Sequence, residues 1–413
     1  MAETVSVAVM GHGVVGSGVV EVILNHKESI SAKIKKDICL KRILDLREFS
    51  NLPYSNLFTK NFDDILNDDS VDIVVEVMGG VHPAYDFVKA CLLKGKSVAT
   101  SNKELVAAKG AELLKIAEEN NVNFLFEASV GGGIPVLRPM AQCLSANDLY
   151  EVFGILNGTT NFILTKMINE NMSFDDALKL AQQLGYAEKE PSADVDGHDT
   201  CRKICILASL AFGKHVYPNQ VKTEGIRKVS LLDVEYATSA DCVIKLVGHT
   251  KLMDDGKISA EVYPALISKD NQLSSVDDVF NAIMVRGDAV GDVMFYGRGA
   301  GKLPTASAVV ADVMDCAKHL YSRKYLSWDE GSEDYVIPAE FVKSKYYLRG
   351  NILDESAAKS EIENLFGDVV YLSREGAQNE IAFITKAEPF GEFEKKVAGI
   401  QNITELSVLH VLD

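Results

Sequence analysis

The chain opens with a short apolar strand that leads directly into a glycine-rich turn and a helix. The apolar run Val5–Met10 precedes the segment Gly11-His12-Gly13-Val14-Val15-Gly16, and apolar residues then recur with helical spacing to about Leu24. A G-x-G-x-x-G pattern between strand and helix makes a tight turn, lets the backbone approach a pyrophosphate and allows close helix–strand packing. Helix N-terminal amides then receive the phosphates. We therefore predict a dinucleotide-binding loop made of Gly11, Gly13, Val14, Val15 and Gly16; the alternative is a glycine-rich turn without a ligand.

Strands and helices continue to alternate up to about residue 135. Further strands are predicted at Ile38–Leu46, Asp72–Met78, Ser97–Thr100 and Asn123–Glu127. This order is typical of a doubly wound parallel sheet of the Rossmann type, so the fold class is α/β. Ser101 and Glu104 have the spacing of a capping box and are expected to open the helix after Ser97–Thr100.

The rhythm changes after this region. Strand-like segments such as Tyr150–Leu156 and Lys257–Ile267 mix with long helices, which indicates an α+β domain over residues 136–299. The glycine-rich stretch Phe295–Ala308 leads into a helix at about 300–321, expected to complete the dinucleotide-binding domain of residues 1–135. Residues 322–344 are polar and irregular, and are predicted to be a linker.

The tail, residues 345–413, shows the order strand, helix, strand, strand, helix, strand. Its predicted segments are a strand from Tyr346, Glu355–Phe366, Val369–Ser373, Glu380–Lys386, Phe390–Gly399 and Thr404–Leu412. This βαββαβ order is the ferredoxin-like plan. The strands Glu380–Lys386 and Thr404–Leu412 are expected to pair or pack between tails of different subunits.

The bulk composition limits the class of partner. A formal net charge of −17 argues against nucleic acid or an anionic membrane surface. No apolar run approaches the roughly 18 residues of a membrane span, and no signal peptide is evident at the N-terminus. Seven scattered cysteines suit reduced thiols. We expect a cytoplasmic enzyme with a small-molecule substrate.

Four acidic side chains and a lysine gather just before an apolar helix. Asp199 and Lys203 are four residues apart and share a helix face. The following segment, Ile204–Phe212, is apolar on every side, as in a buried helix. Burial lowers a lysine pKa and a nearby carboxylate raises it, and this balance makes a lysine usable for proton transfer. The alternative is a solvated acidic loop with a structural ion pair.

Lys103 and the Asn157–Asn161 segment are further candidates. Lys103 lies near the start of a helix, where a cation opposes the helix dipole, at the strand edge where ligands bind. Its alternative is a solvated surface lysine. Asn157-Gly158-Thr159-Thr160-Asn161 can present amides and hydroxyls to a substrate, or can be a simple turn with a helix cap.

Two more positions concern the cofactor and a cation. Asp45, near the end of the second strand, can accept ribose hydroxyls, which leans slightly towards NAD, whereas Arg42 or Arg47 beside it can hold the 2′-phosphate of NADP. Glu127 with the loop Ser129–Pro135 can form a cation site of one carboxylate and backbone carbonyls. A tight loop between domains is the alternative for that segment.

One long motif, A-x-x-L-G-Y-A-E…P-S-x-D-V-x-G-x-D-x-x-x-K, runs from Ala181 to Lys203. With the segments 101–103, 127–135, 157–161 and 297–308, it resembles homoserine dehydrogenase over essentially the whole chain. That family reduces L-aspartate-4-semialdehyde to L-homoserine with NADH or NADPH, reversibly, in threonine and methionine biosynthesis. The alternatives are another small hydroxy-amino-acid dehydrogenase, or a non-catalytic dinucleotide-dependent amino-acid sensor.

The resemblance implies a role for each matching position. Lys203 would transfer the proton, with Asp199 beside it and Lys103 as a second active-site lysine. The implied substrate contacts are Glu188 on the α-ammonium, Asp194, Asn157, Gly158 and Thr159. The implied cofactor contacts outside the glycine loop are Asp45, Ser101, Lys103 and Gly301. Glu127 and the carbonyls of Val130, Gly132 and Ile134 would form a sodium site.

The tail resembles an ACT regulatory domain, which in this family often senses threonine. The first strand–helix turn of many ACT domains contains Asp-x-Pro-Gly, whereas here Asp354-Glu355-Ser356-Ala357-Ala358 lacks proline and glycine. The resemblance therefore implies either a threonine effector site or a tail that only assembles subunits. It also implies a monofunctional enzyme that forms a homodimer or homotetramer.

Overall fold

The computed structural model describes residues 3–322 and 326–412. The chain forms two compact units. Unit 1 comprises Met1–Tyr150, Cys205–Pro218 and Arg286–Gly331, and unit 2 comprises Glu151–Ile204, Asn219–Val285 and Ser332–Asp413. Within the predicted linker 322–344, residues 323–325 lie outside the described residues.

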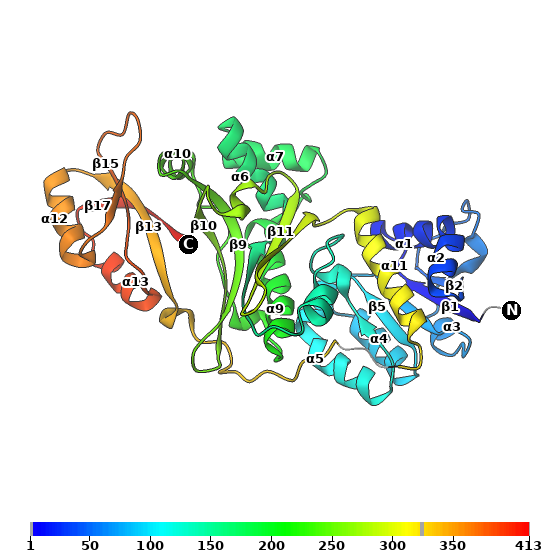
Figure 1. The fold of residues 1–413 in the computed structure, drawn as a ribbon. Coiled ribbons are helices and arrows are strands. Elements are labelled where there is room, and N and C mark those ends of the chain that lie inside the picture. The colour runs from blue at the N-terminus through cyan, green and yellow to red at the C-terminus, as the bar shows by residue number, and fades with distance from the viewer. Residues whose placement is uncertain (1–2, 323–325, 413) are drawn as a thin grey trace. The chain divides into compact units, whose positions relative to one another are not determined.

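A six-stranded parallel sheet forms the centre of unit 1. Its strands run in the order β3-β2-β1-β4-β5-β6 (Figure 1). Their bounds are β1 Thr4–Met10, β2 Asp37–Leu44, β3 Phe58–Thr59, β4 Ile73–Glu76, β5 Ser97–Thr100 and β6 Phe124–Leu125. Every neighbouring pair is parallel. This order confirms the predicted Rossmann-type fold.

Strands β2 and β4 are shorter at their carboxyl ends than the apolar runs predict. Each ladder ends one residue further on: the Asp45 amide donates to the Thr59 carbonyl at 3.1 Å, and the Val77 amide donates to the Met10 carbonyl at 3.0 Å. The next amide of β4's segment, that of Met78, donates to the Glu76 carboxylate at 2.8 Å instead of to a strand. The residues after each strand are thereby available at the ligand-binding edge of the sheet.

Six α-helices of the described residues lie wholly in unit 1 and accompany this sheet. They are α1 Val14–Asn25, α2 Lys27–Ile34, α3 Asp63–Leu66, α4 Ala84–Leu93, α5 Lys103–Glu119 and α11 Lys302–Lys318. Helix α11, far along the chain, packs against α1 (Figure 1). The close approach of α11 to α1 depends on Gly18 of α1, since a Cβ at this position would lie 2.9 Å from the Lys302 carbonyl oxygen. Strand β12, Gly291–Arg298, also belongs to unit 1.

The predicted capping box of Ser101 and Glu104 is wrong. Helix α5 begins at Lys103, and Asn102 is its N-cap: the Asn102 side chain accepts a hydrogen bond from the Leu105 amide at 3.1 Å. Asn102 can also donate, and its Nδ2 lies 2.6 Å from the Gly80 carbonyl. An amide side chain makes both contacts at once, whereas the Ser101 hydroxyl would stand one residue too early.

Unit 2 is a mixed sheet with helices. Its strands run in the order β11-β7-β9-β10-β17-β13-β15-β14. The elements before the tail that lie wholly or partly in unit 2 are β7 Leu149–Ile155, α6 Gly158–Glu170, α7 Phe174–Gln183, α8 Ser192–Val195, α9 His198–Phe212, β8 Lys222–Thr223, α10 Leu231–Ser239, β9 Cys242–Leu252, β10 Ile258–Ser268 and β11 Phe280–Gly287. A buried apolar cluster with Phe153, Val247, Tyr263 and Met284 joins β7, β9, β10 and β11.

The tail has the predicted ferredoxin-like order. Its elements are β13 Lys343–Ile352, α12 Glu355–Phe366, β14 Val370–Leu372, β15 Glu380–Ile384, β16 Glu388–Pro389, α13 Phe390–Ala398 and β17 Ile403–Leu412. Its core combines Ile362 and Phe366 of α12 and Phe393 of α13 with Tyr346 and Phe383 of the strands. Both helices therefore pack on one sheet through a shared apolar core (Figure 1).

One edge of the tail sheet is used inside the chain. His410–Leu412 of β17 pair in parallel with Ala265–Ile267 of β10, while the other side of β17 pairs with β13. The expectation that Thr404–Leu412 pairs along its edge with another tail is therefore wrong over this stretch. Among the helices of the described residues, none has the length and apolar character needed to cross a membrane.

Candidate active site

The glycine loop has the backbone geometry that a pyrophosphate requires. Gly11 has φ +99°, and a Cβ at Gly16 would lie 1.9 Å from the Gly11 carbonyl oxygen. Gly13 is different, because no atom lies within 4 Å of the position its Cβ would take. Helix α1 begins at Val14, directly after this open position. A diphosphate therefore fits where a side chain is absent and helix amides point outward.

Asp45 follows β2 and is fully engaged with its neighbours. Its Oδ1 accepts from the Arg47 amide at 3.0 Å and from Arg47 Nε at 2.9 Å; its Oδ2 accepts from the His12 amide and from Arg47 Nη2, both at 2.8 Å. The Arg47 guanidinium holds the pKa of Asp45 well below its usual range. A surface pocket beside it is lined by Arg47, Glu48, Phe58 and Lys60.

Glu76 is a buried carboxylate at the carboxyl end of β4, and the sequence motifs did not single it out. Thr100 Oγ1 donates to Glu76 Oε2 at 2.6 Å, and the Asn102 amide donates to Thr100 Oγ1 at 2.9 Å. Burial raises the pKa of Glu76, despite these hydrogen bonds. The chain Glu76–Thr100–Asn102 holds the turn that carries Lys103. An acid inside the apolar run DIVVEVM is the signal that could have found it.

The other predicted cofactor residues occupy helix starts. Ser101 lies between β5 and the N-cap Asn102, and Lys103 is the first residue of α5, half-buried. Gly301 is the residue before α11 and has φ +126°, a conformation that favours glycine. All three lie in unit 1, together with the glycine loop.

Glu127 is buried and caps a short helical segment. Its Oε1 accepts from the amides of Val136 and Leu137 at 2.6 and 2.8 Å, and its Oε2 accepts from the Arg138 amide at 2.8 Å. Asp312 of α11 accepts from the Glu127 amide at 2.8 Å and pairs with Arg138 at 2.5 Å. Burial, and then the Glu127 charge, raise the pKa of Asp312 to about 8.

The loop with the predicted cation carbonyls is folded tightly. Gly132 has φ +57°, and a Cβ there would lie 2.3 Å from the Gly299 carbonyl oxygen. Val130 and Ile134 are buried. A carboxylate has about four acceptor positions, and three amides occupy Glu127, so one position remains for a cation. Oxygen donors of this kind suit a hard cation.

In unit 2, Asn157 joins the acid cluster to the start of α6. It is the N-cap of α6, and its Oδ1 accepts from the Thr160 amide at 2.9 Å. Its Nδ2 donates to Asp194 Oδ1 at 2.7 Å and to Asp199 Oδ2 at 2.8 Å. One amide side chain therefore fixes two carboxylates, from α8 and α9, against the first turn of α6.

Lys203 lies on the same face of α9 as Asp199, as the spacing predicts. Lys203 Nζ is 2.8 Å from Asp199 Oδ2 and donates to the Leu156 carbonyl at 2.7 Å. The exposed fractions of Lys203 and Asp199 are 7% and 4%, so this is a buried ion pair rather than a solvated one. Burial and the Asp199 charge raise the pKa of Asp194 above its usual value, against the opposing effect of Asn157 and Lys203.

Thr159 is buried beside Asp194, whereas Glu188 lies at the exposed side of this segment. Thr159 Oγ1 donates to the Tyr186 carbonyl at 2.7 Å. The Glu188 side chain is exposed, and its backbone carbonyl accepts from Gln182 Nε2 at 3.0 Å. The structure thus brings Asn157, Asp194, Asp199 and Lys203 into one network, while the Glu188 carboxylate faces solvent.

Comparisons with known proteins agree on one family. Residues 11–127 match the model described as "Homoserine dehydrogenase, NAD binding domain", and residues 135–314 match the model described as "Homoserine dehydrogenase". A homoserine dehydrogenase of Synechocystis sp. is 44% identical over 358 residues, covering 84% of this chain and 82% of that protein. These matches do not favour the amino-acid sensor or another dehydrogenase.

Solved structures have the same fold. A homoserine dehydrogenase from Thiobacillus denitrificans matches with a TM-score of 0.93 and 32% identity, covering all of both chains. A hyperthermophilic archaeal homoserine dehydrogenase mutant in complex with NADPH matches with a TM-score of 0.64 and 28% identity, over 76% of this chain and 97% of that one. The cofactor is a nicotinamide dinucleotide, and the chain belongs to the homoserine dehydrogenase family.

Proposed function

We propose that Lys203 transfers the proton in the reaction of this family, the reversible reduction of L-aspartate-4-semialdehyde to L-homoserine. The bound nicotinamide supplies the hydride, and the aldehyde oxygen becomes an alkoxide that needs a proton. The buried Lys203 ammonium stabilises that charge and donates. Its 2.8 Å pair with Asp199, and its 2.7 Å bond to the Leu156 carbonyl, support a fixed orientation for the donor.

Asn157, Gly158, Thr159, Asp194 and Glu188 bind the amino-acid substrate in this proposal. Glu188 is exposed and carries a charge that suits an α-ammonium group. Asp194 lies next to Asp199, and burial and then the Asp199 charge raise its pKa. A substrate ammonium near Asp194 relieves this repulsion. The network through Asn157 is the observation that carries the proposal.

The test is an activity assay with homoserine and, in parallel, NAD or NADP. The absorbance of the reduced nicotinamide reports turnover. Reduction of the cofactor with homoserine, and none with threonine or serine, is the expected result. A folded protein that binds dinucleotide but turns over neither cofactor would overturn the proposal.

The cofactor binds along unit 1, with its pyrophosphate at the glycine loop. Ser101, Lys103 and Gly301 contact it in this proposal, and Asp45 and Arg47 lie at its adenosine ribose. The sequence leans slightly to NAD, but the four hydrogen bonds that Asp45 accepts leave no acceptor for ribose hydroxyls. Arg47 and Lys60 line the adjacent pocket. These positions support NADP, because two neighbouring cationic side chains can bind a 2′-phosphate.

Comparing kcat/KM for NADP and NAD in the Arg47→Ala variant tests this preference. We expect NADP to lose about tenfold or more, while NAD gains or stays constant, since Asp45 is released for ribose. Equal losses with both cofactors would contradict the assignment.

A monovalent cation, sodium, is held by Glu127 and the carbonyls of Val130, Gly132 and Ile134 in this proposal. The remaining acceptor position of Glu127 and the tight loop support it. Thermal unfolding in sodium and in tetramethylammonium chloride of equal ionic strength tests the site. Extra stability in sodium that disappears in Glu127→Gln is expected; an equal sodium effect in both proteins would contradict it.

For the tail we propose a role in assembling a homodimer or homotetramer rather than in sensing threonine. Asp354, at the turn where ACT domains bind ligands, accepts from the Ala357 amide at 2.8 Å and serves as the N-cap of α12. Leu353 beside it is completely exposed. Calorimetry with threonine tests the absence of an effector site, and we expect no heat of binding. Sedimentation of the Leu353→Glu variant tests the assembly role, and we expect weaker association of subunits.

A cytoplasmic location agrees with seven free cysteines.

A further inference from the structure

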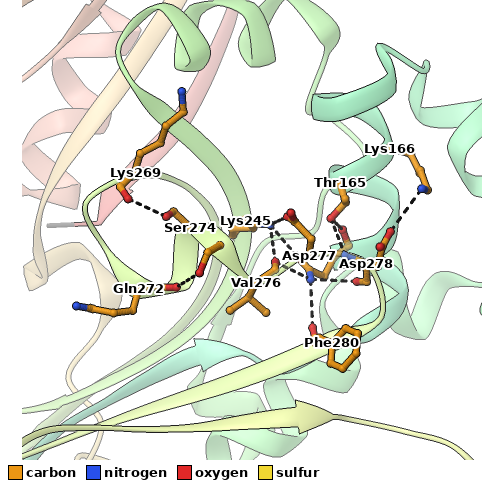
Figure 2. Close-up of polar contacts among 12 residues, drawn as sticks. Thr165, Lys166, Lys245, Lys269, Gln272, Ser274, Val276, Asp277, Asp278 and Phe280 are labelled. Carbon is orange, nitrogen blue, oxygen red and sulfur yellow. Dashed lines mark hydrogen bonds and ion pairs between the residues drawn. The ribbon is translucent and has the colours of Figure 1, made fainter.

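Lys245 is a buried lysine near the start of strand β9, outside the network of Asn157, Asp194, Asp199 and Lys203, which we call the acid–lysine cluster. Its exposed fraction is 1%, and its Nζ contacts Val276 O at 2.7 Å, Asp277 Oδ1 at 3.1 Å and Asn161 Oδ1 at 3.2 Å (Figure 2). Desolvation lowers the pKa of Lys245, although Asp277 acts in the opposite direction. Burial of a cation costs free energy unless the cation is paired and hydrogen-bonded. The partners of Lys245 therefore indicate which part of the structure it stabilises.

The partners belong mainly to one turn, Val276–Phe280, which precedes β11. Asn161 of α6 is the second anchor of this turn. Asn161 Nδ2 lies 3.0 Å from Val276 O, 3.0 Å from Asp278 O and 3.1 Å from Phe280 O. A single amide side chain therefore contacts three carbonyls of the turn and also accepts from Lys245.

Thr165, one helical turn after Asn161, extends this network. Its Oγ1 donates to the Asn161 carbonyl at 2.7 Å and accepts from the Asp278 amide at 3.0 Å. Asp278 has φ +53°, a conformation that non-glycine residues rarely adopt without support. Figure 2 shows Thr165 and Lys245 directed at the turn that contains Asp278. The backbone conformation of the Val276–Phe280 turn thus depends on side chains from α6 and β9.

The Val276–Phe280 turn also lies against the start of α6. A Cβ at Gly158 would lie 2.8 Å from the Val279 carbonyl oxygen, so the turn and Gly158 are in close backbone contact. Gly158 follows Asn157, whose side chain holds Asp194 and Asp199. The position of the turn therefore limits the position of the Asn157–Thr159 segment.

We propose that Lys245 and Asn161 are positioning residues for the amino-acid substrate. They hold the Val276–Phe280 turn against Gly158, and the turn holds Asn157–Thr159 in the geometry that binds substrate. Neither side chain touches the substrate. The inference rests on the proposed substrate-binding role of Asn157, Gly158 and Thr159.

Steady-state kinetics of Lys245→Met test this inference. Methionine has a similar volume but cannot donate to Val276 or Asn161. We expect KM for homoserine to rise about tenfold or more, since small displacements of positioning groups are costly, while Kd for the dinucleotide changes less than about twofold. Lys269→Met is the matched control, because Lys269 is exposed and pairs with Asp241 instead; its KM should stay at the wild-type value.

Thr165→Val keeps the shape of the side chain and removes only the hydroxyl. It provides a milder break of the same network if Lys245→Met fails to fold. We expect KM for homoserine to rise about threefold to tenfold in Thr165→Val, again without a change in dinucleotide Kd. If either folded variant unfolds at lower temperature with unchanged KM for homoserine, the network is merely structural and the inference is wrong.

Asn157→Ala separates this inference from the proposed function. If Asn157→Ala leaves KM for homoserine unchanged, the substrate role of the Asn157–Thr159 segment fails, and the inference fails with it. If Asn157→Ala raises that KM and the Lys245 and Thr165 variants do not, only the inference is overturned.

Discussion

The glycine loop of unit 1 and the acid–lysine cluster of unit 2 are built in opposite ways. The loop works through the side chains it lacks: Gly16 has no room for a Cβ, and Gly13 has open space around it. The cluster works through charged side chains that are already paired and buried, with Lys203 and Asp199 at 7% and 4% exposure. Space therefore limits which substitutions the loop accepts, and charge limits which substitutions the cluster accepts.

This difference determines how each region responds to substitution. An added methyl group in the loop either collides with backbone or occupies ligand space. In the cluster, the removal of one charge has the largest effect, because its partner then stays buried without compensation. The variants below change one of these properties at a time.

The largest expected effect is on catalysis through Lys203. Lys203→Met preserves much of the side-chain volume and removes the proton donor, so kcat should fall by about 10²–10⁴-fold. Dinucleotide affinity should stay within about twofold, since this contact does not belong to the glycine loop. Stopped-flow and steady-state assays measure both quantities. Lys228→Met, at an exposed lysine of the same unit, is the control; a near-normal kcat in Lys203→Met would remove Lys203 from the mechanism.

The second comparison uses the two glycines of the loop. Gly16→Ala should reduce both folding stability, by about 1–3 kcal/mol, and cofactor binding, because its Cβ would meet the Gly11 carbonyl oxygen. Gly13→Ala should keep the stability of the protein without cofactor and lose dinucleotide affinity. Urea unfolding and fluorescence titration measure the two effects. Equal behaviour of both variants would show that Gly13 does not face the ligand.

A smaller effect is expected at Glu188. Glu188→Gln removes the charge and leaves the shape, so KM for homoserine should rise about tenfold with little change in kcat. Initial-rate assays at saturating cofactor measure it, and Glu190→Gln, two residues further along the same exposed loop, serves as the control. A KM that stays constant would mean that Glu188 does not hold the substrate ammonium.

The last prediction concerns stability rather than activity, namely the dependence of stability on pH near Glu127. The pKa of Asp312 is about 8 in the folded protein and 3.8 as its reference value. The folded state therefore keeps a proton that the unfolded state releases, and the stability from this group is present below about pH 4 and lost as pH rises towards 8. Asp312→Asn should flatten this fall. Urea unfolding at several pH values tests it, and an unchanged slope would assign the fall to other groups.

The sequence predicts much of the framework and part of the site. The parallel sheet, the glycine loop and the Asp199–Lys203 pair follow from local periodicity, which short-range sterics dictate. Strands β9 and β11 were not predicted. Strand β9 contains the buried Lys245 and the half-buried His249, and these polar residues interrupt the apolar pattern of a strand. Likewise Asn102, rather than Ser101, caps α5 because Gly80 supplies a second partner.

The sequence by itself determined the order of elements, the dinucleotide loop and the spacing that puts Asp199 and Lys203 on one helix face. Only the tertiary structure decided which distant groups meet: Asn157 between Asp194 and Asp199, the Leu156 carbonyl on Lys203, and the His12 amide on Asp45. The physical reason is range. Backbone propensity and side-chain periodicity act over a few residues, whereas the compensation of a buried charge depends on whichever polar group the fold brings to it.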